Sequence, residues 1–134
     1  MKIILPDPVF IAWGKISKFR EFSCDINAQT YPHIMILEFH CHTYVSKDSL
    51  VRPADLVKAC RSRGIDRVVI TDHNSIRGAL EARTLDPDLV IVGEEIMTTR
   101  GEILAAFLKE EIPSNLTPRQ ALLLLKEQGA FISV

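Results

Sequence analysis

HIMILEFHCH, residues 33–42, is a short apolar run that leads directly into two histidines. DRVVITDH at residues 66–73 and LVIVGEE at residues 89–95 repeat the pattern, each ending in a histidine or in acids. Nearly continuous apolar runs of this length are typical of strands that are buried on both faces. We therefore predict buried strands over residues 33–39, 66–71 and 89–93.

Helical signals separate these strands. Pro53 stands where a first helical turn tolerates proline, and the apolar stripe after it ends at Gly64. After the second strand, Asn74 or Ser75 can cap a short helix that continues to Arg83. Strand and helix thus alternate with short connections, which favours parallel β/α units with right-handed crossovers. The pattern is compatible with a barrel or with an open doubly wound sheet.

The last third of the sequence continues this alternation. EILAAFL (102–108) is predicted to be a fourth strand, paired with the third across the turn TTRG (98–101). Thr117 provides an N-cap hydroxyl, followed by a proline and by a capping-box glutamine, so a helix is predicted from there to about Gln128. FISV (131–134) has the composition of another buried strand.

Composition limits the class of protein. The chain has 134 residues, 47% hydrophobic and 25% charged, with a net charge of −1, which suits a globular domain and gives no general attraction to nucleic acid. Three cysteines without a C-x-x-C pair favour a reducing compartment, and no run reaches the ~20 apolar residues of a membrane span. The cytoplasm is the expected location, with no membrane partner. Residues 1–31 show no clear period and form an extension of unassigned role before a domain at 32–134.

Polar groups gather where the predicted strands end. His40, His42 and Asp48 follow the first strand, Asp72 and His73 the second, and Glu94 and Glu95 the third. The carboxyl ends of parallel strands share one rim, where ligands bind. In an extended segment His40 and His42 point to the same side, so both rings can reach one ion. Imidazoles combined with carboxylates suit Zn, Mn or Fe, and a carboxylate such as Glu95 can bridge two ions.

Each of these features alone has a simpler interpretation. An isolated H-x-H is usually solvated, paired glutamates usually form salt bridges in a turn, and Asp72 alone would be a candidate helix cap. Their occurrence after three successive strands favours a metal site instead.

The same residues also resemble a known family. FHCHTYVSKDSLVRPADLVKACRSRGIDRVVITDHNSIRGALEA (39–82), followed by IVGEEI (91–96), is similar to the PHP domain of the polymerase and histidinol phosphatase superfamily. The resemblance extends from about residue 33 to residue 134. It implies a distorted seven-stranded β/α barrel with parallel strands, helices outside, and two or three Zn, Mn or Fe ions. Carried over by position, the implied metal ligands are His40, His42, Asp48, His73 and Glu95, with Glu95 rather than Glu94 bridging.

The chain departs from the family pattern in two places. Glu102 stands where many members have a histidine, and we retain it as a metal ligand because a carboxylate also binds such ions. The family's later ligands, a histidine before proline and an aspartate–histidine pair, are not in this sequence. The resemblance therefore predicts that the chain is the first part of a longer PHP domain.

These observations predict a metal-dependent phosphoester hydrolase in which two or three ions activate water. Glu95, His73 and Asp72 are expected to support catalysis, Asp72 by orienting a ligand histidine through its ring N–H. Arg100 is a candidate phosphate contact, and the expected substrate is a small phosphoester. Two alternatives remain open: a non-catalytic metal-binding or interaction module, and an exonuclease-like activity on nucleic acid ends, against which the near-neutral charge argues. The oligomeric state is not predicted.

Overall fold

The computed structural model describes residues 2–5 and 35–133. Within these ranges strands and helices alternate through most of the chain. The elements are β1 (Lys2–Leu5), β2 (Met35–Cys41), α1 (Pro53–Ser62), β3 (Arg67–Ile70), α2 (Arg77–Leu85), β4 (Val90–Thr98), β5 (Gly101–Ala106), α3 (Pro118–Gln128) and β6 (Phe131–Ser133).

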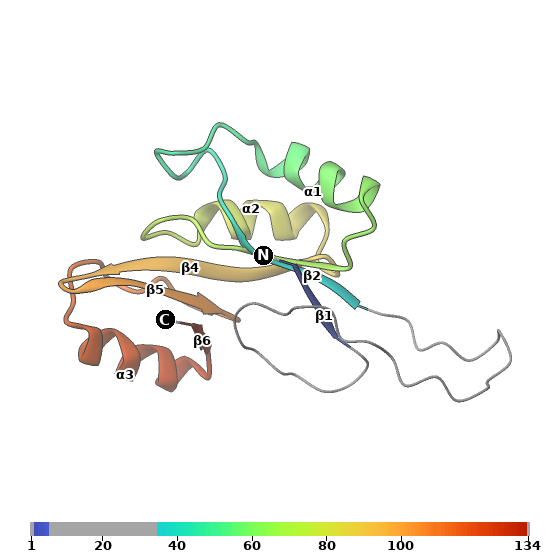
Figure 1. Ribbon diagram of the computed structural model, residues 1–134. Helices are drawn as coiled ribbons and strands as arrows, with labels where there is room; N and C mark the ends of the chain where they lie inside the picture. Colours follow the sequence, from blue (N-terminus) through green and yellow to red (C-terminus); the bar gives the residue numbers. More distant parts are fainter. Residues whose placement is uncertain (1, 6–34, 134) are drawn as a thin grey trace, which may run out of the picture.

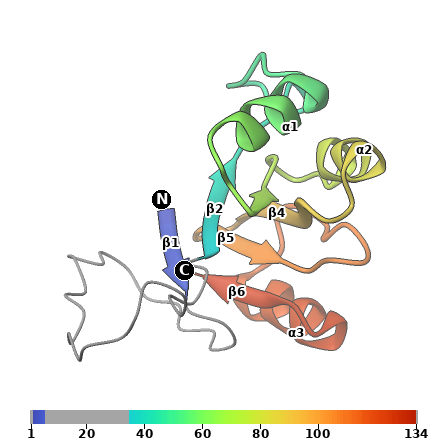
Figure 2. The same ribbon diagram turned by 90° about the vertical axis from the view of Figure 1, so that its right-hand side faces the viewer.

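The six strands form one mixed sheet in the order β1-β2-β3-β4-β5-β6. The pairs β2–β3 and β3–β4 are parallel, as the βαβ pattern predicts. The β4–β5 pair is antiparallel, which confirms the predicted hairpin, and β1–β2 and β5–β6 are antiparallel as well. The sheet is curved, with α1, α2 and α3 on its outer side (Figures 1 and 2). The fold is an α/β half-barrel, consistent with part of a PHP-type barrel.

Apolar side chains form a separate cluster on each face of the sheet. The larger cluster joins strand residues such as Val68 and Ile70 to helix residues such as Ala82 and Leu125, so it lies on the helix-covered face. The smaller cluster consists only of strand residues: Leu37, Phe39, Val69 and Ala106, with Ile91, Leu104 and Phe131 packed against them. We call the face that carries this smaller cluster the inner face.

Local sequence signals explain two of the three helices. α1 begins at Pro53 as predicted, and α3 has the predicted capping box between Thr117 and Gln120 and ends at Gly129, whose φ is 71°. The predicted N-cap position of α2 is wrong, because the N-cap residue is Ile76, although Oγ of Ser75 accepts a hydrogen bond from the N–H of Arg77, 3.3 Å away. Asn74 is unavailable because its Oδ1 accepts a hydrogen bond from the N–H of Met97, 2.8 Å away.

Two strand predictions also need correction. β4 does not end at residue 93 but continues to Thr98, because β5 pairs with it well beyond the end of β3. Glu94 and Glu95 are therefore inside a strand rather than after it. β6 is half-buried at all three positions instead of buried.

The N-terminal extension contributes one described strand. β1 pairs with β2, and the remainder of the extension, including Cys24, lies outside the described residues, so its role is still unassigned. Among the described residues, no helix has the length and apolar character needed to cross a membrane.

Candidate metal centre

A β-bulge in β2 aims the histidines of the first motif. Glu38 and Cys41 are three apart on β2 but pair with residues two apart on β3. The extra residue shifts the alternation of the side chains that follow. Cys41 consequently packs with the outer cluster, although strict alternation would place it on the inner face beside Phe39. His40 and His42 are thereby free to meet Glu95.

His73 and Glu95 are neighbours across the extended end of the sheet. They form a parallel bridge beyond the end of β3, in which the N–H of Glu95 donates to the carbonyl of Asp72 at 3.2 Å and the N–H of Asn74 donates to the carbonyl of Glu95 at 3.0 Å. Asn74 has a φ of 50°, a left-handed conformation that asparagine tolerates better than most residues. This turn carries the chain towards α2 and leaves His73 beside Glu95.

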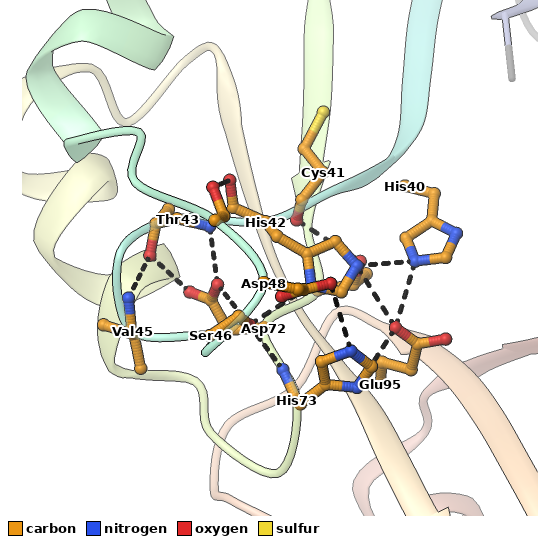
Figure 3. A network of polar contacts seen from close by, with 12 residues as sticks. His40, Cys41, His42, Thr43, Val45, Ser46, Asp48, Asp72, His73 and Glu95 are labelled. Atoms are coloured by element: carbon orange, nitrogen blue, oxygen red, sulfur yellow. Dashed lines mark hydrogen bonds and ion pairs between the residues drawn. The ribbon is translucent and has the colours of Figure 1, made fainter.

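Three imidazole rings lie close to one carboxylate oxygen of Glu95 (Figure 3). Oε2 of Glu95 lies 3.1 Å from Nε2 of His40, 3.2 Å from Nε2 of His42 and 3.4 Å from Nδ1 of His73. The two Nε2 atoms of His40 and His42 are 2.8 Å apart. Only 8% of the Glu95 side chain is exposed, whereas 38% of the His40 side chain is, so the carboxylate lies on the buried side of the cluster.

Two further carboxylates complete the cluster. Asp48 lies 3.6 Å from Nδ1 of His42 and 3.5 Å from Nε2 of His73. Glu102 approaches from β5, with Oε1 3.9 Å from Nδ1 of His73. The residues fall into three groups with metal-ligand spacing, and Glu95 belongs to two of them: His40–His42–Glu95, His42–Asp48–His73 and His73–Glu95–Glu102.

A fully buried hydrogen-bond network supports the histidines. Asp72 has no exposed surface, and its carboxylate accepts from the N–H of Thr43 at 2.6 Å, from Oγ1 of Thr43 at 2.7 Å and from Oγ of Ser46 at 2.9 Å. Ser46 Oγ also accepts the N–H of His73 at 2.9 Å and lies 3.2 Å from Nδ1 of His42. One serine hydroxyl thus connects two histidines of the cluster to the buried carboxylate.

This hydrogen-bond network determines which ring nitrogen of His42 is unprotonated and so able to bind a metal ion. A serine hydroxyl has one proton, and here it goes to Asp72, because an ionised carboxylate can only accept. The remaining contact of Ser46 with His42 therefore requires Nδ1 to carry a proton and donate. Nε2 of His42 is then unprotonated, and this is the atom that faces His40 and Glu95.

The donor set fits a divalent metal. Nδ1 of His73 is buried and has no hydrogen-bond partner, although a buried polar atom normally has one. It faces carboxylates of Glu95 and Glu102, as a metal ligand would. Imidazole nitrogens mixed with carboxylate oxygens suit Zn, Mn or Fe better than a site for Mg²⁺ alone.

All six ligands expected from the sequence come together: His40, His42, Asp48, His73, Glu95 and Glu102. Glu94 faces the other way, as the alternation along a strand predicts, and its Oε2 accepts from the N–H of Ile112 at 2.9 Å. Arg100 stays at the tip of the β4–β5 hairpin with an exposed side chain, and its role as a phosphate contact remains a prediction. Asp72 reaches His42 through Ser46 rather than through the direct ring contact that we expected.

Sequence reasoning missed Thr43 and Ser46. Their signal is weak, because a buried hydroxyl between two ligands looks the same in sequence as an ordinary loop serine or threonine. The bulge had a clearer signal. The apolar side chains of Leu37 and Phe39 have to lie on the inner face of the sheet, and the predicted metal site requires His40 and His42 on that same face. Strict alternation along a strand cannot place both pairs there.

Neither of the two cysteines that the structure describes takes part in the cluster. Cys41 and Cys60 are free thiols, and burial raises the pKa of the Cys41 thiol to about 12. Since the thiolate is the reactive form, Cys41 is an inert packing residue.

Comparison with known proteins identifies the family. The sequence pattern of the PHP domain matches residues 38–128, which include every residue of the metal cluster. The chain belongs to the PHP domain family. Two uncharacterised proteins of Methanocaldococcus jannaschii are each 40% identical to it, over 71% and 73% of this chain. The chain spans 63% of the length of the first of these relatives and 38% of the second.

A solved structure has the same fold. It is a two-domain protein of Bacteroides vulgatus that contains a predicted PHP-like metal-dependent phosphoesterase. The match has a TM-score of 0.62 and 27% identity, and it covers 72% of this chain and 33% of the other. The half-barrel described above is therefore an arrangement found within a larger PHP-containing protein.

Metal binding is expected to stabilise this PHP domain. Adding Zn²⁺ or Mn²⁺ should raise the melting temperature, because ligands that are assembled only in the folded state bind only that state. The His40→Ala/His42→Ala variant should lose the shift. Calorimetry with and without metal measures both, and equal shifts in the two proteins would contradict the assigned site.

Ser46→Ala should weaken the same metal site without removing a ligand. Residues that orient ligand histidines typically contribute 10–100-fold to metal affinity, and a loss of about that size is expected here. Nitrogen-15 NMR of the metal-free protein should also show His42 changing from a defined Nδ1–H tautomer to a mixture. An unchanged tautomer in the variant would contradict the role given to Ser46.

Proposed function

We propose that this PHP domain is the ligand-bearing part of a metal-dependent phosphoester hydrolase. The observation that carries the proposal is the position of Glu95, whose Oε2 lies within 3.4 Å of three imidazole nitrogens, two from the end of β2 and one from the segment after β3. A carboxylate placed in this way is suited to hold two cations together. Paired cations are the feature that two-metal phosphoester hydrolysis needs.

His40 and His42 would hold one ion with Glu95, and His73 and Glu102 would hold a second with the same carboxylate. When bound, such ions lower the pKa of water and offset negative charge on the phosphoryl group. The protein's own contribution is positional. Ser46 and Asp72 keep Nε2 of His42 unprotonated, and the parallel bridge keeps Glu95 beside His73.

The proposed substrate is a small phosphoester. Arg100, two residues before Glu102 at the hairpin tip, is the proposed cationic contact for the phosphate, because a guanidinium pairs well with phosphate oxygens. A long nucleic acid is less favoured, because the net charge of −1 offers no general attraction for a polyanion. The free thiols agree with the proposed cytoplasmic location.

Glu95→Gln tests this function. The amide keeps the size of the side chain but removes the negative charge that would hold two cations. We expect kcat/KM for an aryl phosphomonoester with added Mn²⁺, measured on the full-length protein, to fall on the order of 100-fold or more.

Glu94→Gln is the matched control, with the same chemical change one position earlier on β4. Because Glu94 faces the outer core, its variant should retain hydrolysis within about threefold, a change well below 1.4 kcal/mol in the barrier. Equal losses in the two variants would mean that Glu95 has no special role. A wild-type protein that binds Mn²⁺ but hydrolyses no phosphoester would overturn the proposed function.

A further inference from the structure

A pocket lies at the end of the sheet opposite to the metal cluster. It is a pocket of about 420 Å³ at the ends where β3 and β4 begin and β5 finishes. Val92 of β4 lines it, and Glu95 follows three residues later, about 10 Å further along an extended strand. The pocket is therefore separate from the metal cluster, although the same strand connects the two.

The charge lining this pocket is unbalanced. Arg67, Arg83 and Lys109 line it together with a single carboxylate, Asp88. Within the described part of the chain, none of these three cations forms an ion pair, whereas Arg52 and Arg61 each pair with an aspartate. Within the described residues, the guanidinium of Arg67 donates a hydrogen bond to the backbone carbonyl of Asp66, 3.0 Å away. The pocket lining thus has a surplus of two positive charges. This surplus suits a ligand with two negative charges better than a ligand with one.

The wall of the pocket also offers an aromatic ring. Phe107 has a φ of 66°, a conformation that is rare for a bulky side chain and that persists only where surrounding structure enforces it. Here the next residues enforce it: the N–H of Leu108 donates to Val92 at 3.1 Å, and the N–H of Lys109 donates to Oε1 of Gln128 at 2.8 Å. The side chain of Phe107 remains 46% exposed at the pocket.

We propose that this pocket binds a small aromatic phosphomonoester of the nucleoside monophosphate class. The two guanidinium groups and Lys109 would receive the phosphate, since arginine pairs with phosphate through two parallel hydrogen bonds. The ring would pack on Phe107 and on the apolar floor at Ile91. Ligand pockets usually combine such an apolar lining with a few polar groups, and this volume lies in their usual range.

Calorimetric titration of the metal-free protein in EDTA, with adenosine monophosphate, adenosine and inorganic phosphate as probes, tests the proposal independently of hydrolysis. The monophosphate should bind at least about tenfold more tightly than either partial probe, because each of those lacks one of the two contacts. The Arg83→Gln/Lys109→Gln variant should lose about 100-fold in affinity, about tenfold for each charge-assisted contact removed. Both side chains are exposed, so this variant is expected to fold normally.

Two control variants decide where the probe binds. Arg119→Gln/Lys126→Gln removes two exposed cations from α3, outside the pocket, and should keep wild-type affinity. An equal loss in that protein would reduce the effect to net charge and overturn the site. His40→Ala/His42→Ala should also keep its affinity, and a loss there would place the monophosphate at the metal cluster instead. Absence of binding to the wild type, or phosphate binding as tightly as the monophosphate, would equally refute the proposal.

Discussion

Gly78→Ala is expected to destabilise the fold by about 2 kcal/mol or more, although it replaces glycine by alanine inside a helix. Helix propensity alone predicts the opposite, a gain of about 1 kcal/mol. The reason is the position of Gly78 in α2, where a Cβ atom would collide with the Asp72 carboxylate and with Oγ1 of Thr43. Both of these side chains are fully buried and hydrogen-bonded to each other at 2.7 Å. Overpacking in such a site typically costs 1–3 kcal/mol, and disruption of the buried pair adds to it.

Urea denaturation of the metal-free protein measures this change. Thr84→Ala, at an exposed position of the same helix, is the control and should be neutral or slightly stabilising. Because Asp72 also receives the hydroxyl of Ser46, Gly78→Ala should weaken metal binding as well, whereas the control should not. A stabilised Gly78→Ala protein would show that α2 does not press on the Asp72 network.

The sequence was most informative where one local signal decides the structure. The capping box at Thr117, the proline that starts α1 and the hairpin turn before Gly101 were all confirmed. The convergence of the candidate ligands was predictable in part, because the first histidines and His73 lie at or just after the carboxyl ends of the parallel strands β2 and β3. Glu95 lies inside β4 and meets His73 through a parallel bridge, and Glu102 comes from the antiparallel β5, so strand ends alone do not account for these two.

Features that depend on distant partners were not predictable. The start of α2 was misplaced because Met97, 23 residues further along the chain, takes the side chain of Asn74. The length of β4 depends on its pairing with β5. Ser46 acquires its role only when Asp72 is brought beneath it, 26 positions along the chain. Local propensity carries no information about such pairings.

Glu94 should make the stability of the domain depend on pH in the direction opposite to most carboxylates. Its side chain is fully buried, and burial raises its pKa to about 7 from an ordinary value of 4.5, against the opposing effect of the hydrogen bond from Ile112. The unfolded chain loses this proton near pH 4.5, whereas the folded protein keeps it up to about pH 7. In that interval the folded state binds more protons, so stability must fall as pH rises. Above it the loss is constant, at about 3 kcal/mol for a shift of this size.

Glu94→Gln isolates this contribution, because glutamine resembles the protonated acid and does not titrate. All other ionisable groups are the same in the two proteins, so their contributions cancel in the difference. We expect the free energies of unfolding of wild type and variant to be similar near pH 4.5 and to diverge as pH rises. At pH 8 the variant should be more stable by about 3 kcal/mol. Chemical denaturation of the metal-free proteins between pH 4.5 and 8 measures the difference. A constant difference over that range would mean that Glu94 is ionised in the folded protein, held by a partner for its Oε1, which has none within the described structure.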